Sequence, residues 1–284
     1  MCDQDHFDDD QKEYEFRGLV TRRQFGVLLG AGVAMLLPQV LDAVAVAESE
    51  VTITTPDGMC DAYFVHPSSG TAPAVLVWPD IFGLRPAFRT MGKRLAESGY
   101  SVLVINPFYR VKKAPTAAQG AATPIPELMP LAQAMTETTN MTDAKAFIAW
   151  LDQQPSVAKN KKVGTQGYCM GGPLAFRTAA AVPDRVGAIG SFHGGGLVNN
   201  NPNSPHLLAA KTSAQLLIAI AENDDMRSPN EKNVLKETFG PRAEVEVYTG
   251  AAHGWCPPDT SVYNEPQAEK AWARLLALYK KALV

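Results

Sequence analysis

The stretch VGTQGYCMGG, Val163 to Gly172, places a cysteine between glycines at the end of a short β-rich run. The pattern Gly-x-Cys-x-Gly, formed by Gly167, Cys169 and Gly171, is typical of a nucleophile elbow, a sharp turn from a strand into a helix. Residues beside such a turn must be small, because the turn brings backbone against backbone. Amides at the start of the following helix would favour a thiolate at Cys169. The pentapeptide alone is equally compatible with a small buried core residue.

Around this stretch, short apolar runs alternate with helical patterns from Val51 onward. This alternation predicts one α/β domain, with a single doubly wound and mostly parallel sheet and helices on both of its faces. The runs at 72–79 and 100–107 are almost continuously apolar, as in strands buried on both faces. Apolar residues at helical spacing predict a helix across 128–151. The Pro-, Gly- and Ala-rich loop at 111–126 is expected to form part of a lid or a substrate wall.

Possible partners of Cys169 follow it in the chain order of an α/β-hydrolase, with an acid after a later strand and a histidine after the last one. Asp224 and Asp225 end the run QLLIAIAENDD, and His253 ends VEVYTGAAH. Asp224 is the favoured acid because it stands closer to the strand end. His193 precedes the acid and is expected to be a structural or pocket-wall residue. The three placements together predict a catalytic Cys169, Asp224 and His253.

Residues 1–47 have the character of an export signal. The sequence TRRQF, Thr21 to Phe25, precedes an apolar run, and the small residues of AVAVA suit cleavage near Ala47. Paired arginines before a mildly apolar core resemble a twin-arginine signal. We therefore expect an exported, periplasmic protein whose partner is the twin-arginine export machinery, with a hydrolase domain over 48–284.

The apolar run itself, 26–41, is too short and too interrupted for a comfortable membrane span. Pro38 lies within it and Asp42 follows directly. We therefore expect no stable membrane insertion after processing. An uncleaved membrane anchor is the alternative.

Composition excludes several classes of protein. The chain has 284 residues, of which 46% are hydrophobic and 19% charged, which is ordinary for a globular protein. Eight acidic and four basic side chains lie within residues 1–47, so the remainder is close to neutral. No basic field therefore indicates nucleic acid or a lipid surface as a partner. Four cysteines are too few for a disulfide scaffold.

From about Val51 to its C-terminus the chain resembles the dienelactone hydrolase family, on the motifs WPDIFGLRP, GYSVLVINPFYR, GTQGYCMGG, AENDD and AAHGW. Members of that family are single-domain α/β-hydrolases with a Cys-His-Asp triad. The resemblance implies Cys169 as nucleophile, His253 as general base and then acid, and Asp224 as the group that orients the imidazole. It also implies hydrolysis of a small-molecule lactone or ester through a thioester, with no metal or organic cofactor.

Further site residues follow from the same resemblance. The backbone N–H groups of Ile81 and Met170 would hold the oxyanion. Asp80 stands where members often have a glutamate that restrains the thiol, and its side chain is one methylene shorter. Arg110 matches an arginine that receives a substrate carboxylate. The second arginine expected shortly after His253 is missing, so a free carboxylate on the substrate is a weaker expectation than hydrolysis itself.

An apolar pocket beside the site is expected from the aromatic residues of these motifs. Its predicted wall consists of Phe82, Phe108, Tyr109 and Trp255. Cys256 is expected to be a packed thiol near the site and outside it.

Two other functions stay open: a thiol redox or sensor protein that uses Cys169 with Cys60 or Cys256, and a non-catalytic binding protein on a hydrolase fold. The lack of a Cys-x-x-C sequence argues against the first.

Overall fold

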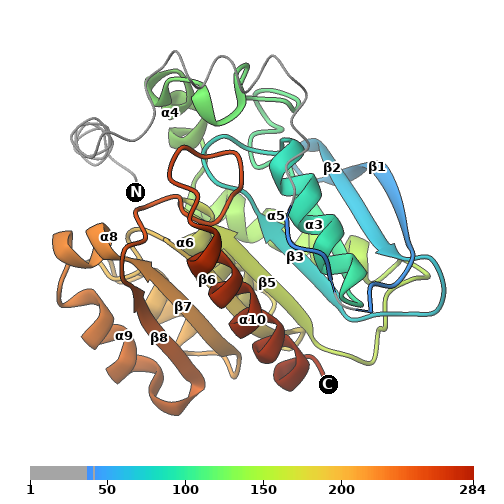
Figure 1. Ribbon diagram of the computed structural model, residues 1–284. Coiled ribbons are helices and arrows are strands. Elements are labelled where there is room, and N and C mark those ends of the chain that lie inside the picture. Colours follow the sequence, from blue (N-terminus) through green and yellow to red (C-terminus); the bar gives the residue numbers. More distant parts are fainter. Residues whose placement is uncertain (1–36, 41) are drawn as a thin grey trace.

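The computed structural model describes residues 37–40 and 42–284 (Figure 1). Eight strands form one sheet in the order β1-β2-β4-β3-β5-β6-β7-β8. β2 pairs antiparallel with β1 and β4, and every other neighbouring pair is parallel. The predicted fold class, an α/β protein with a doubly wound and mostly parallel sheet, is therefore confirmed.

The apolar runs at 72–79 and 100–107 each form a strand as predicted, and the first strand begins at Val46, five residues before the predicted start of the pattern. The bounds of the strands are β1 Val46–Thr55, β2 Gly58–Pro67, β3 Ala74–Trp78, β4 Ser101–Ile105, β5 Val163–Tyr168, β6 Val186–Phe192, β7 Gln215–Ala221 and β8 Ala243–Tyr248. The α-helices are α3 Pro86–Glu97, α4 Ile125–Gln133, α5 Glu137–Leu151, α6 Gly171–Ala181, α7 Pro205–Ala209, α8 Glu222–Arg227, α9 Glu231–Phe239 and α10 Glu265–Ala282. Two short 3₁₀ turns lie at Gly120–Ala122 and Gly240–Arg242.

Helices cover both faces of the sheet, and α3 and α10 lie in front of it in Figure 1. β3 shows why, because all five of its residues are buried. Leu76 and Trp78 pack into the core that α5 and α6 share, whereas Val75 and Val77 pack into the core on the side of α3 and α10. Alternate side chains of a strand point to opposite faces, so a strand buried on both faces must be apolar throughout.

The apolar pattern from Leu128 to Leu151 forms two helices, so the prediction of one continuous helix is wrong. α4 ends at Gln133 and α5 begins at Glu137. Thr136 caps α5: its Oγ1 accepts from the Thr139 backbone N–H at 3.1 Å, and its own N–H donates to Thr139 Oγ1 at 2.9 Å. This reciprocal capping gives hydrogen-bond partners to backbone N–H groups that would otherwise be unpaired at the start of the helix. The sequence carries a sign of this break, because residues 136–143 contain only one apolar side chain, that of Met141.

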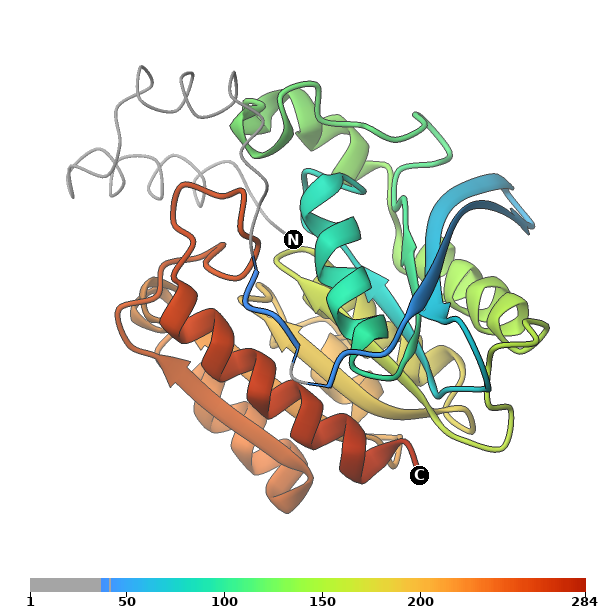
Figure 2. The same cartoon turned by 45° about the vertical axis from the view of Figure 1, so that its right-hand side comes forward.

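Residues 1–36 and 41 lie outside the described residues, and with them lies the predicted twin-arginine stretch, so export stays a prediction. The described part of the same segment runs between α3 and α10 (Figure 2). Val44 N–H donates to Glu97 O at 3.0 Å, and Ala47, the expected cleavage position, pairs with His66 within the sheet. Among residues 37–40 and 42–284, no helix is long and apolar enough to cross a membrane.

Backbone segments lie very close to one another at the turn between β5 and α6. Cys169 has a φ of 53°, in the left-handed region. A Cβ on Gly167 would lie 1.9 Å from Gly171 O, and one on Gly171 would lie 2.4 Å from Trp78 O. The elbow predicted from the Gly-x-Cys-x-Gly pattern therefore exists, and both glycines are required by contact with backbone atoms that cannot move aside.

Gly167→Ala should lower the free energy of unfolding by about 3 kcal/mol or more, because the new methyl group overlaps a backbone carbonyl. Gly195→Ala is the matched control, since nothing lies within 4 Å of a Cβ built there. Urea unfolding followed by circular dichroism measures both variants. Equal midpoints for the two variants would show that the elbow tolerates a side chain.

Candidate functional site

Four side chains of types that can take part in catalysis meet at the carboxyl edge of the sheet. Cys169 follows β5, His193 follows β6, Asp224 lies in α8 directly after β7, and His253 follows β8. These four strands are consecutive parallel neighbours, so their carboxyl ends lie at one edge. Residues separated by more than 80 positions in the chain therefore come together.

His253 is paired with Asp224. Its Nδ1 lies 2.8 Å from Asp224 Oδ2 and 3.1 Å from Oδ1, and its backbone N–H donates to Asn223 Oδ1 at 2.9 Å. Asp225 instead accepts from Lys232 Nζ at 2.6 and 2.8 Å. Asp224, the aspartate that the sequence favours over Asp225, is thus the one bonded to the imidazole ring of His253. A carboxylate on Nδ1 leaves Nε2 of His253 as the atom that can exchange a proton with another group.

His193 links the cysteine to the histidine. Its Nδ1 accepts from the backbone N–H of Cys169 at 3.1 Å, while that N–H also approaches Phe192 O at 3.0 Å. The ring packs edge-on against His253, with 4.9 Å between centroids. Accepting at Nδ1 assigns the proton of the neutral ring to Nε2. Burial, reinforced by the neighbouring His253, holds the pKa of His193 well below its usual value, so this ring stays neutral.

Two backbone amides face the same region. Ile81 lies in the turn after β3, and Met170 directly follows Cys169. Among the hydrogen bonds of the described residues, neither the Ile81 nor the Met170 amide donates to another group. Both residues pack in one apolar cluster with Cys169. Buried amides without a partner are rare, so these two N–H groups are available as hydrogen-bond donors.

A cavity of about 640 Å³ opens at this edge, and we call it the main cavity. Its walls come from the junction of α4 and α5, from the first half of α6 and from the loop after β6. The lining residues are Ile81, Met129, Ala132, Gln133, Met135, Thr136, Glu137, Met170, Pro173, Leu174, Arg177, Gly195, Gly196, Asn199 and Asn201. The substrate wall expected from the loop at 111–126 is thus built mainly by the residues that follow it. Ala117 lies in the apolar cluster that contains Cys169, and Ile125 from the same loop packs partly buried against that cluster.

Asp80 is held in a buried ion network. Arg85 donates Nη1 to Asp80 Oδ1 at 2.6 Å and Nη2 to Oδ2 at 3.0 Å, and it also donates to Asp259 at 2.6 and 2.9 Å. Burial disfavours the charged guanidinium, but the two carboxylates outweigh it and raise the pKa of Arg85, which stays protonated. Phe82 N–H donates to Asp80 Oδ1 at 2.9 Å, so the network shapes the turn that carries Ile81. Restraint of the thiol by Asp80 stays a prediction.

Arg110 is occupied by two carboxylates. Its Nη1 and Nη2 donate to Asp143 at 2.7 and 2.8 Å, and Nη2 and Nε donate to Asp57 at 2.5 and 3.1 Å. Its guanidinium also lies over the Tyr109 ring, 4.7 Å from the centroid. A substrate carboxylate would have to displace one of these partners. The sequence could not reveal this competition, because Asp57 and Asp143 lie 53 and 33 positions away.

The four aromatic residues expected in the pocket wall divide into two pairs. Phe108 packs in the apolar cluster around Cys169, and Phe82 packs partly buried against it. Tyr109 instead donates its hydroxyl to Asp143 Oδ1 at 2.7 Å. Trp255 is fully buried beneath His193, with 5.1 Å between the ring centroids. None of the four is among the described residues that line the main cavity.

The other thiols lie in packed surroundings. Cys60, Cys169 and Cys256 are all buried, and no disulfide joins any of these three described cysteines. Burial raises the pKa of Cys60, with Asp61 adding to the effect, and burial alone raises that of Cys256. High thiol pKa values disfavour the reactive thiolate, which weakens the redox alternative for this pair.

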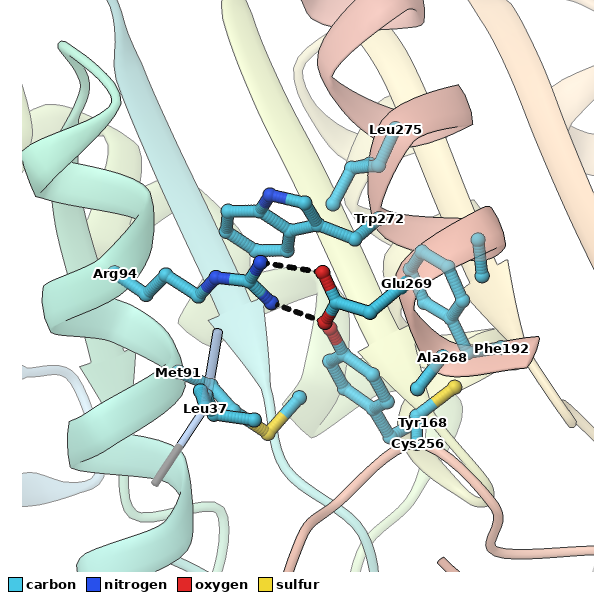
Figure 3. A pocket seen from close by; sticks show the side chains of 11 residues that line it. Leu37, Met91, Arg94, Tyr168, Phe192, Cys256, Ala268, Glu269, Trp272 and Leu275 are labelled. Carbon is cyan, nitrogen blue, oxygen red and sulfur yellow. Dashed lines mark hydrogen bonds and ion pairs between the residues drawn. The ribbon is translucent and has the colours of Figure 1, made fainter. Parts of the chain in front are cut away.

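Cys256 lines a crevice of only about 30 Å³ between α3 and α10, which holds little more than one water molecule (Figure 3). Arg94 and Glu269 close it with two hydrogen bonds of 2.6 Å, and Leu37 lies at its edge. Cys256 is therefore a packed thiol outside the main cavity. Within the described residues, no three His, Cys, Asp or Glu side chains are grouped to hold a metal ion.

Three charged residues at this edge were not singled out from the sequence. Arg85 stands in WPDIFGLRP and Asp259 in HGWCPPD, and only folding brings them together across 174 positions. Arg177 lies in α6, two turns after the elbow. The sequence signal for it was a single charged residue in an otherwise apolar helix start.

Comparison with known proteins gives a consistent result. The model of the dienelactone hydrolase family matches residues 60–283. The chain is similar to the carboxymethylenebutenolidase of Rhodococcus opacus, with 26% identity over 230 residues, which covers 78% of this chain and 86% of that protein. It also resembles the crystal structure of the dienelactone hydrolase-like promiscuous phosphotriesterase P91 from metagenomic libraries, with a TM-score of 0.69, 21% identity and coverage of 84% and 100%. The dienelactone hydrolase of Anabaena variabilis gives a TM-score of 0.59 at 19% identity, over 84% and 99% of the two chains.

His193 should make the protein sensitive to acid. The unfolded chain binds a proton on this residue near pH 6.5, whereas the folded protein does so only at a lower pH. Stability is therefore full above about pH 6.5 and falls as the pH drops towards the folded pKa, by up to about 1.4 kcal/mol per pH unit.

His193→Asn, which tolerates the left-handed backbone, should show a smaller loss over the same range. Urea unfolding at a series of pH values measures both slopes. Identical slopes in the two proteins would show that His193 does not contribute.

Proposed function

The chain belongs to the dienelactone hydrolase family, and from this premise we propose that it hydrolyses a lactone or a small carboxylic ester with Cys169 as the nucleophile. The observation that carries the proposal is the pairing of His253 Nδ1 with Asp224 at 2.8 Å, beside a cysteine on a glycine-flanked elbow. A histidine oriented in this way serves an adjacent nucleophile, and a packing role alone would not need the carboxylate.

Acylation begins when the sulfur of Cys169 attacks the ester carbonyl carbon. The thiol proton passes to His253, and the carbonyl oxygen becomes an oxyanion. The free amides of Ile81 and Met170 support this step, because two preorganised donors stabilise that charge without reorganisation. The carbon–oxygen bond to the alcohol then breaks, His253 gives its proton to the leaving oxygen, and an acyl thioester remains on Cys169. For a lactone, the alcohol stays joined to the acyl group.

Deacylation repeats the sequence with water. His253 takes a proton from the water as its oxygen attacks the thioester carbon, and the same two amides hold the second oxyanion. The carbon–sulfur bond breaks, the thiol regains its proton, and the carboxylic acid leaves. The reaction consumes one water and needs no oxidant or reductant.

Asp224 acts through His253. Its carboxylate fixes the imidazole with the proton on Nδ1 and stabilises the imidazolium that forms in both steps. Neutral His193, edge-on to His253, gives the ring a wall and adds no competing charge. The apolar cluster around Cys169 excludes water from the thiol, which strengthens each of these interactions.

Cys169→Ala should reduce kcat for p-nitrophenyl esters by at least about 10³-fold, because no other buried group replaces the thiolate. Rapid quenching of the unmodified protein with substrate, followed by mass spectrometry, should detect an acyl group on the peptide that contains Cys169. Cys256→Ala is the matched control and should keep its activity, since that thiol lies in a separate crevice. Full activity of Cys169→Ala would overturn the proposal.

The two neighbouring aspartates provide a second test. Asp224→Asn should lower kcat/KM for the same esters by roughly 10²- to 10⁴-fold, because an amide no longer fixes or stabilises the His253 ring. Asp225→Asn removes the same charge from a side chain that is bonded to Lys232, and it should change kcat/KM less than about threefold. The assignment is wrong if Asp225→Asn is the more damaging of the two.

A further inference from the structure

One cationic side chain in the main cavity has no counter-charge bound to it. Arg177 lies on α6 and lines the cavity together with the two proposed oxyanion residues, Ile81 and Met170. Its Nε–H is buried without a partner, and across the described residues no hydrogen bond or ion pair engages its guanidinium. The other buried or half-buried arginines near the site, Arg85 and Arg110, are each bound by two carboxylates.

The surroundings of Arg177 favour an anion. Burial lowers the pKa of Arg177, and Glu137, which lines the same cavity, opposes that effect through space. No ion pair forms between Arg177 and Glu137 in the part of the chain that the structure describes. The guanidinium thus bears a desolvation cost that no bonded carboxylate offsets, and a bound anion would relieve it.

The position of Arg177 fixes how far such an anion lies from the reacting carbonyl. Arg177 is seven residues after Met170, which corresponds to roughly 10 Å along the helix axis. Long side chains on a helix point back towards its N-terminus, so the guanidinium reaches part of the way towards the elbow. A ligand with its carbonyl at the amides of Ile81 and Met170 therefore needs an extended chain before its anionic group meets Arg177.

Part of the cavity wall is apolar, and polar side chains such as those of Gln133 and Asn199 line the rest. Met129, Met135, Pro173 and Leu174 line the apolar part, and they suit an aliphatic chain. A volume of about 640 Å³ is in the range of pockets for extended ligands, and a small lactone ring alone would leave much of it empty.

We propose that Arg177 is a specificity-determining residue that binds the far carboxylate of an extended acyl chain, so that monoesters of medium-length dicarboxylic acids are preferred substrates. The inference rests on the proposed function, because it takes the carbonyl to lie at Cys169. The reacting end is held by the elbow amides, the methylenes pack on the methionine and leucine side chains, and the terminal carboxylate forms a bidentate pair with the guanidinium. Arg110 does not compete for this carboxylate, since Asp57 and Asp143 occupy it.

The test compares two esters of equal length on the purified full-length chain: the p-nitrophenyl monoester of suberic acid and p-nitrophenyl octanoate. The suberate ester should have a kcat/KM about tenfold higher, the value of one charge-assisted pair in a partly solvated site. In Arg177→Met this ratio should fall to one or below, because Glu137 remains and repels the anion. Glu137→Gln should increase the ratio.

Arg89→Met is the matched control, because it removes a charge from α3 that pairs with the exposed Glu50 on another part of the surface. Its ratio should equal that of the unmodified protein. Equal ratios in the unmodified protein and in Arg177→Met would overturn the role of Arg177 and leave ester hydrolysis intact.

A binding measurement separates this inference from the proposed function, because it needs no turnover. Calorimetry should show suberamic acid, the monoamide of suberic acid, binding more tightly than octanamide, and Arg177→Met should lose the difference. This result would support the anion site even if no ester were hydrolysed. Equal affinities of the unmodified protein for the two amides would overturn it.

Discussion

The close backbone approach at the elbow is the constraint on which the site depends. Gly167 and Gly171 lie so near to each other and to Trp78 that any side chain would overlap a carbonyl group. That contact forces Cys169 into a left-handed conformation at the end of a buried strand. Its amide then meets His193, and the next amide, that of Met170, is left without a partner. The proposed nucleophile and half of the proposed oxyanion site thus come from one turn.

The parallel pairing of the strands brings the other residues of the site to the same edge. β5 to β8 are neighbours in chain order, so each following loop emerges one strand further along the same edge. His193, Asp224 and His253 follow β6, β7 and β8, and His253 contacts both of the others. The helices on both faces bury the strands, so these polar side chains meet at the carboxyl edge of the sheet and not on one of its faces.

Three arginines near the site illustrate how a tertiary structure distributes charge. Arg85 is bound by Asp80 and Asp259, and Arg110 by Asp57 and Asp143, so the protein itself neutralises both. Arg177 is the arginine of the main cavity to which no described carboxylate is bonded. A cation that the fold leaves available, at a set distance from the thiol, is a means of selecting substrates by length and charge together.

Sequence by itself determined the fold class, the strands and the elbow, because these depend on local apolar runs and on glycines whose spacing is fixed within a few residues. Chain order also placed Cys169, Asp224 and His253 at one edge of the sheet, since loops after consecutive parallel strands share an edge. The break between α4 and α5 escaped it, although residues 136–143 contain only one apolar side chain, that of Met141. The sequence also did not reveal the partners of Asp80 and Arg110, the burial of Trp255 or the exposure of Arg177 to the cavity. Only the tertiary structure decided these, because ion pairs and cavity walls form between residues whose separation in the chain carries no local signal.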